Sequence, residues 1–137
     1  MTRRAMWVIV FAGVVYLSTG LIFGAFAGQA ASHQWRVAWR GAAWLISSIV
    51  FGGHVLYERI ALRSASRIAA LHVSSAAGLG AFGLAAAANL HALNSPMHRP
   101  PHLLVLSLAI WPIITMIPAF VVAWAAAALV ARMRRAA

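Results

Sequence analysis

Long apolar stretches, separated by short polar segments, dominate the chain. Four stretches contain no formally charged side chain: residues 5–35, 41–57, 68–98 and 100–131. A helix needs about 20 apolar residues, within a range of about 17–25, to cross a membrane. Three stretches meet this easily. Residues 41–57 are fewer, but long charged side chains at both ends can extend to the membrane surface. The pattern predicts an all-α fold with helices at roughly 6–30, 36–60, 69–93 and 103–131.

The segments between these stretches are polar, as connections between helices should be. Residues 94–102 read NSPMHRPPH, and the three prolines in this segment cannot continue a helix. The other two connections are expected at residues 29–34 and 59–67. The chain has no long repeat, so we expect one domain, a four-helix transmembrane bundle over residues 1–137.

The arginines predict how the bundle is oriented. Eight of the eleven lie at the two chain ends and in the second connection: Arg3, Arg4, Arg59, Arg63, Arg67, Arg132, Arg134 and Arg135. The regions of the first and third connections, on the opposite side of the membrane, have only three: Arg36, Arg40 and Arg99. Because positive residues are enriched in cytoplasmic loops, both termini are expected in the cytoplasm, in a multi-pass protein of the cell (inner) membrane.

The first stretch also has features of a secretory signal. Thr2-Arg3-Arg4 resembles a basic leader segment, and Ala25-Phe26-Ala27 resembles a cleavage site. The apolar run is much longer than the roughly 7–15 residues typical of a signal. We therefore expect a spanning helix here.

Composition agrees with a membrane protein and excludes much chemistry. Hydrophobic residues make up 64% of the chain and charged residues only 9%, against about 25% charged in soluble domains. The chain has no Cys, Asp or Lys, and Glu58 is its single acidic residue. Thiolate, paired-carboxylate and Ser-His-Asp sites are therefore excluded, as are phosphate-binding loops that use Lys. We expect no enzyme unless a haem or metal is bound.

The net charge of +10 still has consequences for partners. The arginines flank apolar stretches, whereas a DNA-binding protein would gather them on a soluble face. They predict contacts with membrane lipid, including anionic lipid, and no binding of nucleic acid.

The second predicted helix has a narrow polar face, and this is the most informative feature of the sequence. At roughly 100° per residue, its members fall within about 40° of one another. We call the set the polar face: Arg36, Arg40, Ser47, His54 and Glu58. Polar side chains inside a membrane avoid lipid, so this face should point into the bundle or a water-filled cavity.

Three functions are compatible with the polar face. The first is movement of an ion, proton or small solute along it, since imidazoles titrate near neutral pH and a neighbouring carboxylate can exchange protons with them. The second is a purely structural His–Glu pair in a non-catalytic subunit of a larger membrane complex. The third is electron transfer by a cofactor.

The cofactor hypothesis depends on a hairpin centred near Ser64. Such a hairpin brings His54 and His72 to similar depth, where they could bind haem b, or with Glu58 a divalent metal. A second group near the opposite end could also bind metal: His33, His91, His98 and His102.

Small residues predict close helix packing. Gly20, Gly24 and Gly28 form a small-xxx-small ridge on the first helix, suited to contact within the bundle or to a homo-oligomer. Residues 78–83 match G-x-G-x-x-G, but they lie within an apolar helix with no preceding strand, so we expect packing and no dinucleotide site.

Overall fold

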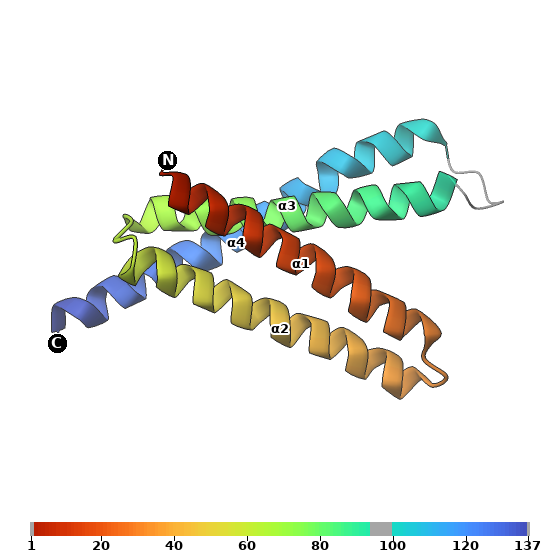
Figure 1. Cartoon of the computed structure of the whole chain (residues 1–137), viewed down its shortest axis with the longest axis horizontal. Coiled ribbons are helices and arrows are strands. Elements are labelled where there is room, and N and C mark those ends of the chain that lie inside the picture. The colour runs from red at the N-terminus through yellow and green to blue at the C-terminus, as the bar shows by residue number, and fades with distance from the viewer. Residues whose placement is uncertain (1, 94–99, 137) are drawn as a thin grey trace.

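The computed structural model describes residues 2–93 and 100–136, which form four α-helices (Figure 1). These are α1 (Arg3–Gln29), α2 (His33–Ile60), α3 (Ser66–Leu93) and α4 (Pro101–Ala136). The all-helical prediction and the number of helices are confirmed. Each helix starts two or three residues before its predicted start. Side-chain caps explain two of these starts: Thr2 accepts a hydrogen bond from the Ala5 amide, and Ser32 from the Trp35 amide.

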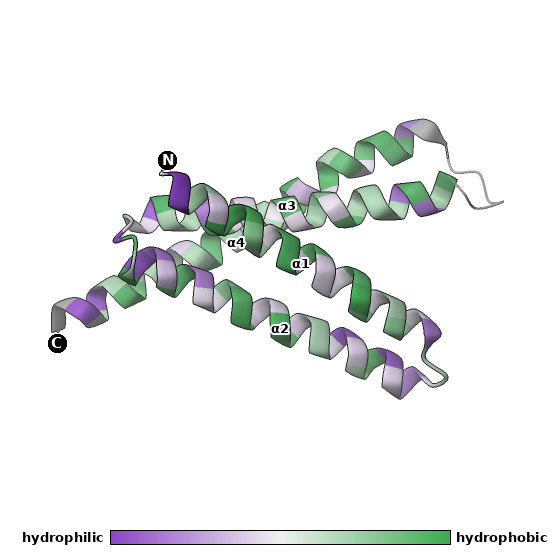
Figure 2. Cartoon of the chain, viewed as in Figure 1, coloured by the Kyte–Doolittle hydropathy of each residue, from purple (hydrophilic) through white to green (hydrophobic). Residues whose placement is uncertain are grey.

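Within the described residues, three helices are long and apolar enough to cross a membrane: α1, α3 and α4 over His102–Arg134. Helix α2 is as long as α3 but less apolar. Figure 2 shows why, because its most hydrophilic residues gather towards its two ends. The prediction of four spans is therefore supported for three of them.

The helices form two hairpins that meet at one end and diverge at the other (Figure 1). Both termini and the α2–α3 connection lie where the hairpins meet; we call this the arginine-rich end. The α1–α2 connection lies at the opposite end. Arg99 is outside the described residues, as is His98.

Helix α3 is the central helix because it packs against both α1 and α4. In the apolar window of α3, 44% of residues are buried, against 17% for α1 and 11% for α4. The hydrophobic core lies towards the arginine-rich end, where α2, α3 and α4 converge. Its buried members are Val55, Ala69, Ala70, Val73, Ala123 and Ala127.

The glycines of α3 allow this close packing. A Cβ on Gly80 would lie 2.6 Å from the Tyr16 Cβ of α1, and one on Gly78 would lie 2.5 Å from Met116 of α4. Gly83 packs against Leu17 in the same way. The G-x-G-x-x-G spacing is thus a packing surface for two neighbouring helices.

The glycine ridge of α1 is divided. Gly20 packs tightly against Leu84 of α3, where an added Cβ would come within 2.7 Å of that side chain. A Cβ on Gly24 or Gly28 would meet no described atom within 4 Å. The reason is the divergence of the hairpins, which carries this part of α1 away from α3. Of the two contacts expected for the ridge, contact within the bundle is therefore seen at Gly20, and a homo-oligomer contact at Gly24 and Gly28 stays a prediction.

Candidate functional site

Glu58, the single acidic residue, lies near the end of α2 and is fully buried. His54, one turn earlier on the same face, is only 5% exposed. The polar face therefore points into the protein at the arginine-rich end, as its periodicity predicts. A buried carboxylate is costly unless it is paired and hydrogen-bonded, so its contacts decide what the site can do.

The Glu58 carboxylate has a partner on each oxygen. The Ser64 hydroxyl donates a hydrogen bond to Oε2 over 2.6 Å. Nδ1 of His72, on α3, lies 2.9 Å from Oε1. These contacts connect α2, the α2–α3 connection and α3 through one side chain.

The α2–α3 connection folds back over the end of α2 to make this possible. Arg63 has a left-handed backbone conformation (φ 52°), which reverses the chain. The Ser64 amide then donates a hydrogen bond to the Glu58 backbone carbonyl over 2.9 Å. Ser64 thus contacts Glu58 through both its amide and its hydroxyl. The Arg59 guanidinium donates to the Ser64 carbonyl, and Arg134 of α4 donates to the Arg59 carbonyl over 3.2 Å.

His54 is placed differently from His72. Its Nε2 lies 3.8 Å from the same Oε1 atom of Glu58, too far for a hydrogen bond. Neither ring nitrogen has a hydrogen-bond partner in the part of the chain that the structure describes. One carboxylate oxygen thus lies between two imidazoles, with one in contact and the other close by. We call Glu58, His54, His72 and Ser64 the Glu58 cluster.

A cavity of about 410 Å³ gives access to the Glu58 cluster from the arginine-rich end. It is lined by Thr2, Ala5, Leu62, Ser64, Ile68 and His72. The His72 side chain is 14% exposed, while Glu58 is closed off behind it. Of the Glu58 cluster, His72 and Ser64 therefore border this cavity.

The donor set fits a haem or metal poorly. Among residues 2–93 and 100–136, no group of three or more His, Asp or Glu side chains is arranged to hold a metal ion. A haem between His54 and His72 would have to displace the Glu58 oxygen that lies within 3.8 Å of a nitrogen of each ring. Of the second histidine group, His33, His91 and His102 are exposed.

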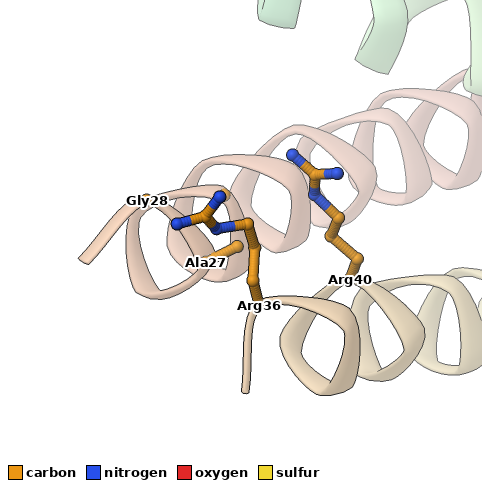
Figure 3. A pocket seen from close by; sticks show the side chains of 5 residues that line it. Ala27, Gly28, Arg36 and Arg40 are labelled. Carbon is orange, nitrogen blue, oxygen red and sulfur yellow. The ribbon is translucent and has the colours of Figure 1, made fainter. Parts of the chain in front are cut away.

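At its other end the polar face does not point into the protein, because Arg36 and Arg40 are exposed beside α1. Arg36 and Arg40 extend from α2 across the helix–helix groove (Figure 3). With Gly24, Ala27 and Gly28 they line a cavity of about 420 Å³, which we call the far cavity. Ser47 is half-buried between the two sites. The two cavities share no lining residue.

Sequence reasoning brought His54, His72 and Glu58 together and missed the role of Ser64. It treated Ser64 only as the centre of the hairpin. Its contact with Glu58 depends on the left-handed Arg63, and arginine gives no local signal for that conformation. Comparisons with protein families, with curated proteins and with solved structures find no match to this chain.

Proposed function

We propose that this protein relays protons through His72, Glu58 and His54, and so moves protons, or a small solute coupled to them, along the polar face of α2. The observation that supports this most is the burial of Glu58 between two imidazoles in a chain with no other acidic residue. Ionisable residues inside membrane proteins are costly and are typical of proton relays and ion pathways.

The order of the relay follows from access and distance. His72 borders the cavity at the arginine-rich end and contacts Glu58 at 2.9 Å. A proton delivered by Nδ1 of His72 to Oε1 of Glu58 neutralises the carboxylate. The protonated carboxyl then needs only a small movement to reach His54 Nε2, now 3.8 Å away. The unpaired nitrogens of His54 make it a suitable acceptor.

Beyond His54 the path is longer. Ser47 is two turns away, or about 10 Å along the helix axis. Water or the transported solute must bridge this step before Arg40 is reached. The three side chains of the relay thus carry the proton at the arginine-rich end of the pathway. Water or the transported solute carries it from His54 onwards.

The same proposal includes the topology. Helix α2 runs beside α1 as an antiparallel partner of similar length (Figure 1), so we propose that it crosses with α1 as a fourth span. Most of the arginines gather at the end with both termini, which supports a cytoplasmic location for that end in a cell (inner) membrane.

The decisive test is proton flux into liposomes that contain the purified protein and an internal pH dye, driven by a potassium diffusion potential. We expect the wild-type protein to acidify the lumen and Glu58→Gln to return the rate to that of protein-free liposomes. Ser48→Ala is the matched control, because Ser48 is exposed on another face of α2 and donates to the Trp44 carbonyl. Equal fluxes for wild type and Glu58→Gln contradict the proposal.

A second candidate is a non-catalytic subunit of a larger membrane complex, or a homo-oligomer. It is favoured by the unpacked surface of the α1–α2 hairpin, where Trp44 is 78% exposed. Five glycines there have no described atom within 4 Å of an added Cβ: Gly24, Gly28, Gly41, Gly52 and Gly53. Co-purification of a constant partner at a fixed ratio from native membranes would support this candidate, and a strictly monomeric protein would contradict it.

A further inference from the structure

The far cavity, at the opposite end of α2 from the Glu58 cluster, has the features of an anion site. Arg36 and Arg40 lie one turn apart. Figure 3 shows the Arg36 side chain beside Ala27 and Gly28, and the Arg40 side chain reaching towards α1 further along the helices. The volume of about 420 Å³ lies within the range of small-molecule sites, roughly 300–1,000 Å³.

The positive charge of this cavity has no compensation within the chain. Glu58 has the only acidic side chain, and it lies eighteen residues beyond Arg40, or about 27 Å along α2. It is already engaged by Ser64 and His72. Arg36 also lies at the end of the first turn of α2, which has no acidic residue, and Arg40 follows one turn later. Two guanidinium groups one turn apart therefore add their potentials at the far cavity.

The floor of the far cavity is open because of glycine. A Cβ added to Gly24 or Gly28 would meet no described atom within 4 Å, so packing within the described chain does not explain their small size. Their lack of a side chain instead leaves the space beneath the guanidinium groups free. A larger residue at Gly24 would fill the cavity without disturbing a helix contact.

We propose that the far cavity binds a phosphate group, held by Arg36 and Arg40 over the surface of α1 at Gly24 and Gly28. Planar guanidinium groups pair with phosphate oxygens through two parallel hydrogen bonds, which suits two arginines on one helix face. This site lies at the far end of the polar face, outside the His72–Glu58–His54 relay, and binding of its ligand requires no proton movement.

The phosphate has two chemical sources, a phospholipid headgroup and a free phosphate anion. Aromatic side chains next to the cavity place it at the level of a membrane interface if the bundle spans one, since Trp is enriched there. Trp39 packs at 5.0 Å from Phe26 and 6.4 Å from Trp35, measured between ring centroids. These tryptophans also provide a fluorescence signal beside the site.

The test titrates the full-length protein, in a neutral maltoside detergent, with inorganic phosphate and separately with short-chain phosphatidylglycerol. Binding is followed by tryptophan fluorescence and calorimetry. We expect binding of at least one probe, weakened by about tenfold or more in Arg36→Gln/Arg40→Gln. Arg3→Gln/Arg4→Gln is the matched control, because it removes the same charge at the arginine-rich end, and it should leave the affinity unchanged.

A second pair of variants tests the cavity without removing charge. Gly24→Leu should weaken binding, whereas Gly41→Leu, which is equally free of contacts but outside the cavity, should not. Preference for phosphatidylglycerol identifies the headgroup as the source, and preference for inorganic phosphate identifies the free anion. Absence of binding by either probe, or equal weakening by both arginine pairs, overturns the proposal. Because no proton gradient is used, this result is independent of the flux experiment.

Discussion

His72 on α3 lies with its Nδ1 2.9 Å from Oε1 of Glu58 on α2, and so connects two helices that otherwise have few contacts with one another. The Glu58 side chain is fully buried, whereas the His72 side chain is partly exposed. Removing His72 leaves the buried carboxylate with the hydrogen bond from Ser64, in a medium that solvates the charge poorly.

The first prediction concerns this pair. We expect His72→Leu to lower the free energy of unfolding by about 1–3 kcal/mol, because it leaves a buried carboxylate with one hydrogen bond fewer. Glu58→Gln in the same background should restore part of that loss, since a neutral amide is cheaper to bury. Reversible unfolding in mixed micelles measures all four proteins of the double-mutant cycle. Strictly additive effects would mean that the two side chains do not interact.

The second prediction concerns the central helix. Gly80→Ala should destabilise the bundle by about 1–3 kcal/mol through overpacking. The added methyl group would lie 2.6 Å from Tyr16 Cβ and 3.3 Å from the Gly13 carbonyl oxygen, so α1 and α3 must separate.

Gly53→Ala on α2 is the control for this substitution. It makes the same chemical change where no described atom lies within 4 Å. Helix propensity alone then applies, and we expect stability to stay equal or rise by up to about 1 kcal/mol. Thermal unfolding in detergent compares the two variants. If they behave alike, α1 and α3 do not pack at Gly80.

The third prediction concerns topology, and the absence of native cysteine makes it simple to test. Ala31→Cys in the α1–α2 connection and Ala65→Cys in the α2–α3 connection both place a thiol at an exposed position. In intact cells we expect a membrane-impermeant maleimide to label position 31 only. Position 65 should react after the membrane is permeabilised. The opposite pattern would show that the bundle has the reverse orientation.

Much of this architecture is encoded in short-range patterns. The spacing of charges and prolines separates the four helices, and the 3.6-residue period directs His54 and Glu58 towards the interior. The symmetry of a hairpin about Ser64 brings His72 to the depth of His54. These features depend on positions along one helix or on two adjacent helices, which a sequence displays directly.

Other features depend on how the hairpins are placed relative to one another. Gly20 and Gly24 have the same local sequence signal, yet only Gly20 meets α3, because the hairpins diverge beyond it. Helix α2 is long enough to cross a membrane, but it is not among the helices that are also apolar enough. No local pattern reports the angle between two hairpins, so these outcomes needed coordinates.

The last prediction concerns Arg63, the residue that turns the chain over Glu58. A non-glycine residue at φ 52° costs about 1 kcal/mol or more, and a β-branched residue is worse. Arg63→Gly should therefore keep the connection folded, with stability unchanged or raised by up to about 1 kcal/mol after the entropy of the unfolded chain is included. Arg63→Val should lower stability by about 1–2 kcal/mol.

If Ser64 holds Glu58 through this turn, the two variants should also differ in proton flux. Arg63→Val displaces the Ser64 hydroxyl from Oε2 and should slow the relay, whereas Arg63→Gly should retain it. Arg67→Gly provides the control for loss of charge, because it removes an arginine from the first turn of α3, where glycine costs up to about 1 kcal/mol of helix stability relative to alanine. Unfolding and flux measured on the same preparations separate the two effects. A glycine variant less stable than the valine variant would show that Arg63 does not adopt the left-handed conformation.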